Sequence, residues 1–259
     1  MGSEALVNLM IMHLLVSIRF LALLLTAAAF LLPSFPNPVR FWLALMLSVV
    51  VTPTVGAEVP AVLLSSWVSI AVMGLREFII GAALGFISSL PLYAMQISGY
   101  MDSSLMGFNM MNMFDPMSSS QTSVLAQVKY LIAVWFFLHW DGHVLLVQAL
   151  RESVRLVPVG LSMWPGADGP PWFDWLQRAF VIALRLSLPV FGAILLAEVG
   201  LGFVARTVPQ MNVFVLGIPI KICMGFFILL TLLPVSVDVF HSQIEKAVLW
   251  ALEGIHHWR

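Results

Sequence analysis

Residues 208–222 read VPQMNVFVLGIPIKI, and their composition decides how the apolar segments on either side are expected to fold. Two prolines, a glutamine, an asparagine, a glycine and a lysine interrupt sequence that is otherwise strongly apolar. Proline removes a backbone donor and clashes with the preceding helical turn, and a lysine at membrane depth is unfavourable unless it is paired or faces water. The pattern therefore predicts a broken helix with one buried cation, Lys221, because protein or a water-filled cavity can satisfy such a break. A short loop between two membrane spans, with Lys221 reaching the lipid headgroups, is the alternative.

The overall composition is that of a protein integrated in a membrane. Of the 259 residues, 61% are hydrophobic and 10% are charged, and the mean hydropathy is +0.99. Soluble domains are about half apolar and about a quarter charged. The net charge of −1 provides no basic surface for nucleic acid, and the single cysteine, Cys223, allows no disulfide within this sequence. The first apolar segment is too long for a cleaved signal, and Glu4 and Arg19 do not suit one, so we expect an uncleaved chain.

Six apolar blocks follow one another, and they predict an all-α fold because each is long enough for a helix of about 20 residues. They cover roughly 5–32, 39–55, 61–97, 124–156, 172–204 and 213–240. The third block is too long for one straight span, and Pro91 near its end favours a kink or a hairpin. A polar tract over 98–123 follows the third block, and 241–259 has the pattern of a short amphipathic helix. Long apolar blocks joined by tight turns indicate helical hairpins.

Charged and small residues inside the apolar blocks predict contacts between helices. Lone charges in hydrocarbon are unfavourable, so we expect ion pairs among them, with a proton or ion pathway as the alternative. The charged set is Arg19, Arg76, Glu77, Lys129, Arg185, Glu198 and Lys221. Gly81 and Gly85 form a GxxxG pattern, which lets two helix backbones approach closely. Helix packing is therefore expected at Arg19, Glu77, Gly81 and Gly85.

No residue pattern predicts catalysis or a bound metal. His139 and His143 stand four residues apart in HWDGH, but Trp140 occupies the position where a zinc hydrolase carries glutamate. The Asp-Gly pair in the same motif is typical of a turn. None of the serines at 88, 89 and 118–120 lies in a Gly-x-Ser-x-Gly elbow. We therefore expect no enzyme activity, no cofactor and no metal site.

A methionine-rich tract at 105–123 reads LMGFNMMNMFDPMSSSQTS. It is too polar to face lipid although long apolar blocks flank it, so we expect it in a space lined by protein. Methionine is unbranched and polarizable, and a cluster of such side chains can close around variable shapes and open again. The tract suggests a deformable gasket, with an ordinary exposed loop as the alternative. The candidate gasket residues are Met106, Gly107, Phe108, Asn109, Met110, Met111, Met113, Phe114, Asp115, Pro116 and Met117.

Taken together, these segments resemble one known family, the R subunit of the flagellar export gate, which is shared with the T subunit of virulence-type secretion systems. The matching segments are IRFLALLLTAAAFL at 18–31, LREFIIGAALGF at 75–86, ISGYMDSSLMGF at 97–108, FDP at 114–116, DGHVLLVQAL at 141–150 and LVPVG at 156–160. The most specific is VPQMNVFVLGIPIKI, which combines Pro-Gln, Asn-x-Phe and Gly-x-Pro elements in that order. The resemblance covers nearly the whole chain.

The resemblance implies a subunit that assembles with several copies of P and Q subunits into a cone-shaped, helical gate in the bacterial inner membrane, at the flagellar basal body. Residues 1–170 would form a P-like part, with a plug loop at 106–122, and residues 171–259 would form a Q-like helical hairpin. Further implied partners are the B subunit, which is the export switch protein, other export and basal-body components, and unfolded export substrates. In this family the loop that matches 107–120 plugs the closed channel.

The resemblance also assigns the residues of the 208–222 turn to packing between subunits. Q subunits carry a similar Phe-x-x-Pro-Lys turn, which this chain matches with looser spacing. The expected turn residues are Pro209, Gln210, Asn212, Phe214, Gly217, Pro219 and Lys221. Because helices of this family pack against sister subunits, the resemblance does not require all six blocks to span lipid.

Three alternative interpretations are less consistent with the sequence. Gly217, just before Ile-Pro-Ile-Lys, favours the flagellar branch over the virulence branch. A secondary transporter with broken helices would repeat its broken-helix motif, whereas this sequence holds a single VPQMNVF. An intramembrane hydrolase lacks its motif. The expected function is a non-enzymatic subunit of a channel that passes unfolded flagellar proteins across the inner membrane.

Overall fold

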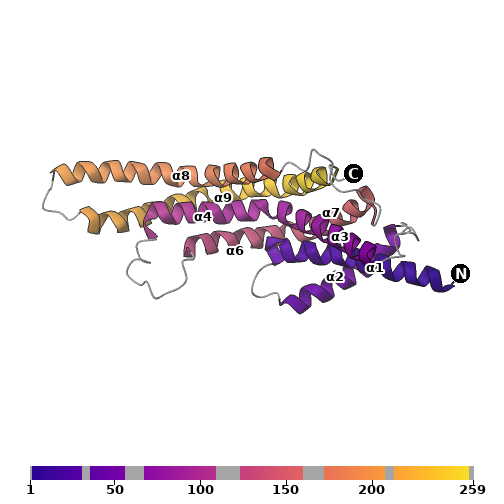
Figure 1. Cartoon of the computed structure of the whole chain (residues 1–259). Coiled ribbons are helices and arrows are strands. Elements are labelled where there is room, and N and C mark those ends of the chain that lie inside the picture. The colour runs from indigo at the N-terminus through magenta and orange to yellow at the C-terminus, as the bar shows by residue number, and fades with distance from the viewer. Residues whose placement is uncertain are drawn as a thin grey trace. The chain divides into compact units, whose positions relative to one another are not determined.

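The computed structural model describes residues 2–30, 36–55, 67–108, 123–159, 172–207 and 213–256, and every regular element in these ranges is helical (Figure 1). The α-helices are α1 (Gly2–Thr26), α2 (Asn37–Val55), α3 (Trp67–Ser88), α4 (Leu90–Met106), α6 (Val124–His139), α7 (Gly142–Leu156), α8 (Trp172–Thr207) and α9 (Val213–His256). A short 3-10 helix, η1, covers Ala28–Phe30. The predicted all-α fold is confirmed.

Several of these helices have the length and composition of membrane spans. Within the described ranges, four contain a candidate span, at Leu6–Thr26, Trp67–Ser88, Trp172–Thr207 and Leu216–Gly254, and α6 with α7 gives a fifth if the two form one interrupted span. Helix α8 has 36 residues and α9 has 44. At 1.5 Å per residue they are about 54 Å and about 66 Å long, well beyond the roughly 30 Å of a hydrocarbon core. These two helices therefore extend past a single perpendicular crossing.

The chain divides into two compact units, each made of segments that are distant in sequence. Unit 1 contains Met1–Leu90, Trp140–Trp175 and Ile244–Arg259, and unit 2 contains Pro91–His139 and Leu176–Gln243. In unit 1, α1 packs against α2 and α3, and α7 packs against α2 and α3. In unit 2, α4 contacts α6 and the parts of α8 and α9 that belong to this unit. The division predicted at residue 170 rests on likeness to sister subunits, and it stays a prediction.

The polar tract expected after residue 97 is partly helical. Helix α4 continues to Met106, so Ser98 and Asp102 lie on a helix and both side chains are wholly buried. Their polarity therefore marks an interior face with buried partners and does not indicate a loop. The expected interruption of the third apolar block falls at Ser89. Pro91 follows in the first turn of α4, where its missing N–H has no helical partner to lose.

Helix α9 is continuous from Val213 onward, in the second part of the 208–222 stretch where the sequence predicted a break. It begins at Val213 and contains Pro219, so Gly217, Pro219 and Lys221 are helical and the prediction that they form a turn is wrong. A proline in a helix removes one backbone hydrogen bond, and a long helix packed in an apolar environment keeps its remaining bonds. The connection between α8 and α9 covers 208–212, which lies outside the described residues.

The helix expected at 241–259 is present over 241–256, where it forms the end of α9 and not a short helix of its own. Helix α9 runs through Phe240 and His241 without interruption and ends at His256, because no proline or glycine separates the apolar block from the more polar end. The turn expected in HWDGH is confirmed. Asp141 has a φ of 55°, in the left-handed region, and it separates α6 from α7.

Candidate functional site

Arg19 on α1 lies at a buried junction of three helices in unit 1. Its Nε donates to Glu77 Oε2 on α3 at 2.5 Å. One terminal nitrogen donates to Ser153 Oγ on α7 at 3.2 Å, and the other donates to the backbone carbonyl oxygen of Val157 at 3.2 Å. The side chains of Arg19 and Glu77 are 0% and 1% exposed. Burial of these charges is tolerable because each is paired and hydrogen-bonded. We call these four residues the Arg19 clamp.

Gly81 and Gly85 let α3 approach α1 closely within unit 1. A Cβ atom added at Gly81 would lie 2.9 Å from the carbonyl carbon of Arg19 and 3.0 Å from the Cβ of Ala22. A Cβ added at Gly85 would lie 2.6 Å from the carbonyl oxygen of Leu23. These separations are too short for nonbonded atoms, so the two helices can lie this close only where α3 has no side chain. The GxxxG face of α3 therefore packs on α1. The sequence pattern predicted a close helix contact but not which helix would make it.

Replacing Gly81 by alanine is expected to reduce the amount of assembled protein, because the methyl group would press on the backbone of α1. Overpacking of this kind costs about 1–3 kcal/mol, which exceeds the gain of about 1 kcal/mol in helix propensity. Gly74→Ala on the same helix is the matched control, since its Cβ would meet only Ile18 Cδ1 at 3.4 Å, an ordinary contact. Immunoblots of membranes should show much less of the Gly81 variant than of the control. Equal amounts would contradict a tight α1–α3 contact.

Asp102 on α4 is the centre of a second buried polar group, in unit 2. Its carboxylate pairs with the ammonium group of Lys129 on α6 and accepts a hydrogen bond from Ser187 Oγ on α8 at 2.7 Å. Lys129 also donates to Ser98 Oγ at 3.1 Å. Burial raises the pKa of the Asp102 carboxyl, while the Lys129 charge and the hydrogen bonds oppose that rise. These four residues, the Asp102 cluster, connect α4 to α6 and α8.

The sequence interpretation named Lys129 as a charge in need of a partner but missed Asp102 and Ser187. A signal was present, because Ser98 and Asp102 are four residues apart and would lie on one face of a helix. That signal was hidden by the interpretation of 98–123 as a single polar tract.

Lys221 on α9 pairs with Glu198 on α8 in unit 2. The side chains are 25% and 54% exposed, so the pair lies at the surface of this chain. The neighbouring side chains Leu196 and Ile220 are exposed as well. The surface around the Lys221–Glu198 pair is thus apolar. A partner that covers this surface would have to accommodate two opposite charges, which cancel each other.

The described part of the methionine-rich tract is its beginning, at Met106, Gly107 and Phe108. Met106 is wholly buried and packs in an apolar cluster of unit 2 with Leu125, Val190 and Ile194. Met106 is thus covered by other residues of this chain, and its role as a gasket residue stays a prediction. The remaining candidate gasket residues lie outside the described residues: Asn109, Met110, Met111, Met113, Phe114, Asp115, Pro116 and Met117. Their role as a seal stays a prediction.

The residues assigned to packing between subunits are only partly described. Pro209, Gln210 and Asn212 lie outside the described residues, and Phe214 is described in its helical backbone alone. Gly217 is buried, and its added Cβ would meet Leu201 of α8 at 3.4 Å, an ordinary contact. Contacts with other subunits stay a prediction for all of them.

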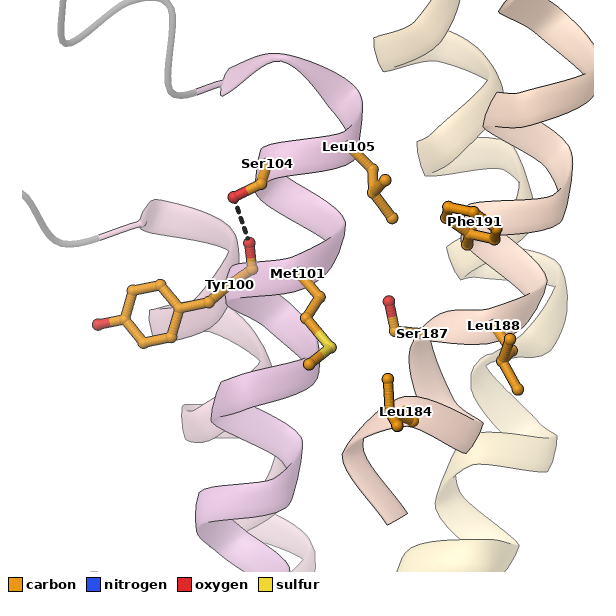
Figure 2. A pocket seen from close by; sticks show the side chains of 8 residues that line it. All are labelled: Tyr100, Met101, Ser104, Leu105, Leu184, Ser187, Leu188 and Phe191. Carbon is orange, nitrogen blue, oxygen red and sulfur yellow. Dashed lines mark hydrogen bonds between the residues drawn. The ribbon is translucent and has the colours of Figure 1, made fainter. Parts of the chain in front are cut away.

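A groove of about 550 Å³ opens between α4 and α8 in unit 2 (Figure 2). It is lined by Tyr100, Met101, Ser104, Leu105, Leu184, Ser187, Leu188 and Phe191. The lining is mostly apolar, and Ser187 connects it to the Asp102 cluster. These lining residues include no acid, histidine or cysteine, so the groove lacks the converging groups of a catalytic pocket.

The histidines of HWDGH have separate surroundings. The ring of His139 stacks on that of Trp135, with the centroids 5.2 Å apart. His143 Nδ1 is buried and has no hydrogen-bond partner in the described part of the chain. Across the described ranges, no three His, Cys, Asp or Glu side chains are grouped so that they would hold a metal ion.

The structure thus defines an all-helical protein with membrane-length helices, in which buried ion pairs and glycine contacts join the helices. The chain matches the bacterial export proteins, family 1, over residues 10–247, and it belongs to this family.

The similar proteins include flagellar biosynthetic proteins and a Yop proteins translocation protein. The flagellar biosynthetic protein FliR of Bacillus subtilis (strain 168) is 30% identical over 261 residues, which cover 97% of this chain and 99% of the relative. FliR of Escherichia coli (strain K12) is 29% identical, covering 84% of this chain and 82% of the relative. The Yop proteins translocation protein T of Yersinia pestis is 29% identical, covering 70% of this chain and 68% of the relative.

Proposed function

We propose that this protein is a core subunit of the flagellar type III export gate and forms part of the channel that passes unfolded flagellar proteins across the inner membrane. The observation that carries the proposal is the nearly end-to-end similarity to a flagellar biosynthetic protein, over 97% of this chain. The virulence-associated relative covers 70% of the chain. This difference in coverage supports the flagellar branch over the virulence branch.

The surface of the two longest helices supports a role inside an assembly. Large apolar side chains are exposed along both, including Phe173, Leu196 and Phe203 on α8 and Phe227 and Leu230 on α9. Lipid covers such side chains only within the hydrocarbon core, which is about 30 Å thick, and both helices are longer. Apolar faces beyond that depth need protein partners, and helices of sister subunits would supply them.

The proposed partners follow from the family. P and Q subunits would pack around this subunit, with residues 1–170 resembling a P subunit and 171–259 resembling a Q subunit hairpin. The B subunit, other export and basal-body components, and unfolded substrates complete the set. The Pro209–Lys221 segment would contact a neighbouring subunit, and the Glu198–Lys221 pair would lie in that interface without adding net charge.

In the proposed mechanism the subunit catalyses no reaction, and an ATPase and the proton gradient elsewhere in the apparatus supply energy. Its contribution is to keep the channel closed when no substrate is present. Met110, Met111, Met113 and Phe114 would form an apolar constriction, which excludes water and ions by dewetting. Methionine side chains deform at little cost, so an arriving polypeptide would displace them.

Secretion by a strain that lacks this gene tests the proposal. Loss of the gene is expected to abolish release of hook and filament proteins, and an affinity-tagged copy should restore release and co-purify with P-like and Q-like subunits. Loss of effector secretion with normal flagella would instead indicate the virulence branch. Normal secretion of both classes, together with lost uptake of a small molecule, would indicate a transporter and refute the export function.

A further inference from the structure

Met106, the last residue of α4, inserts into a notch on α9 within unit 2. Its side chain is 0% exposed and belongs to the apolar cluster with Val190 and Ile194 of α8. A Cβ atom added at Gly225 of α9 would lie 2.7 Å from Met106 Cγ and 2.9 Å from its Sδ. The Cγ atom is only two bonds from the Cα of Met106, so it can move aside only if the side chain changes its rotamer about the Cα–Cβ bond. Met106 therefore fits only because position 225 carries no side chain.

The two residues after Met106 keep the chain at the same place on α9. Gly107 has a φ of +86°, and its N–H donates to the carbonyl oxygen of Ser104 at 3.2 Å, which ends α4 in a left-handed turn. Phe108 packs edge to face on Phe226, with ring centroids 6.0 Å apart. Side chains on both sides of the turn thus contact neighbouring residues of α9.

We infer that Met106, Phe108 and Gly225 form a fixed anchor that sets where the chain enters the methionine-rich tract, and that Gly225 is a positioning residue for the seal. This inference rests on the proposed sealing function of the tract. A wholly buried side chain in a close-packed interior does not act as a deformable surface. Met106 would instead hold the start of the tract at a fixed position on α9, at the point where the chain leaves for the proposed seal.

Residues of the candidate gasket thus have two different tasks. Met106 and Phe108 belong to the anchor, and their contacts with α9 persist during export. The residues from Asn109 onward carry the proposed seal. The task of the anchor depends on a glycine more than a hundred residues away in sequence, on helix α9, whose Phe226 also contacts Phe108.

Alanine substitutions on either side of the Met106–Gly225 contact, made in the assembled gate, test the anchor. Gly225→Ala is expected to displace Met106 and to raise ion leakage per complex several-fold, measured as the proton permeability of membranes without export substrate. Gly74→Ala is the control for adding a methyl group to a helix and should leak like the parent, because its Cβ has an ordinary contact. Met106→Ala removes the anchoring side chain itself and should also raise leakage per complex, because the start of the tract is then no longer held on α9.

A merely structural contact gives a different result. In that case Gly225→Ala lowers the number of complexes while leakage per complex stays at the parent level, and this result would overturn the inference. Deleting residues 109–114 in the parent distinguishes a failure of the anchor from a failure of the proposed seal. If the deletion leaks but Gly225→Ala and Met106→Ala both stay tight, the anchor is wrong and the seal stands. If the deletion stays tight, the proposed sealing function itself fails.

If Gly225→Ala does not assemble, a cross-link tests whether Met106 stays in contact with position 225 during export. Met106→Cys and Gly225→Cys would place two sulfurs close enough for a disulfide, in a Cys223→Ser background that removes the native thiol. Because the anchor is fixed, the oxidised variant should export substrates at the rate of its reduced form and remain tight. Export that stops on oxidation and recovers on reduction would show that Met106 must leave Gly225, which contradicts a fixed anchor.

Discussion

Replacing Arg19 by methionine is expected to remove most of the folded protein from the membrane. The substitution leaves the Glu77 carboxylate, which is 1% exposed, without its cationic partner. It also removes the donors to Ser153 and to the Val157 carbonyl, which hold the end of α7. Breaking a buried pair on one side costs about 3–5 kcal/mol, a large part of the roughly 5–15 kcal/mol that keeps a typical protein folded.

Two comparisons show whether burial is the cause. Arg155→Ala breaks the Arg155–Glu152 pair of 3.6 Å, whose side chains are 57% and 46% exposed. Such surface pairs contribute at most about 1 kcal/mol, so this variant should accumulate like the parent. The double substitution Arg19→Met with Glu77→Leu removes both buried charges and should recover part of the loss. Immunoblots of membranes and the melting temperature of the purified complex provide the measurement. Parent-like levels of Arg19→Met would mean that the clamp is dispensable.

Elements and partners differ in how far the sequence predicts them. The apolar blocks indicated helices at nearly all the observed positions, because the length and hydrophobicity of a block are local properties. Arg19 and Glu77 were both recognised as charges in need of partners. Their direct contact, across 58 positions of sequence, and the further bonds to Ser153 and Val157 depend on how α1, α3 and α7 pack. No local sequence pattern predicts how these three helices pack against one another.

The errors have a common physical origin. Asp102 and Ser98 were assigned to a polar tract on their polarity alone, but they lie on a helix whose polar face is turned inward onto Lys129 and Ser187. Pro219 was taken as a helix breaker, but the loss of one hydrogen bond does not end a helix of 44 residues. In both cases tertiary packing outweighed a local preference.

Met106 shows the same limit within the candidate site. Its sequence neighbours suggested one continuous gasket, since five methionines fall within twelve residues. The contact with Gly225 separates Met106 from the others, and that contact joins two helices far apart in the chain. A glycine in an apolar helix gives no indication of which side chain fills the space above it.

Deleting Asn109 to Phe114 is expected to have the largest effect on function. The deletion removes Met110, Met111 and Met113 but leaves the Asp102 cluster and the contact of Met106 with Gly225, so the complex should still assemble. An empty channel without an apolar constriction stays wet and conducts ions. Aspartate in place of the three methionines should leak in the same way because charged side chains hydrate the constriction. Leucine in place of the methionines should keep the seal and slow its opening, because leucine is stiffer.

The most direct test of the central claim, that this chain closes a protein-conducting channel, is the ion conductance of membranes that contain the assembled gate and no export substrate. Conductance is divided by the amount of intact complex in the same membranes, so that loss of assembly is not mistaken for a tight seal. We expect a low conductance per complex for the parent and for the leucine variant, and a high conductance for the deletion and for the aspartate variant. A deletion that assembles and conducts no more than the parent would contradict the claim.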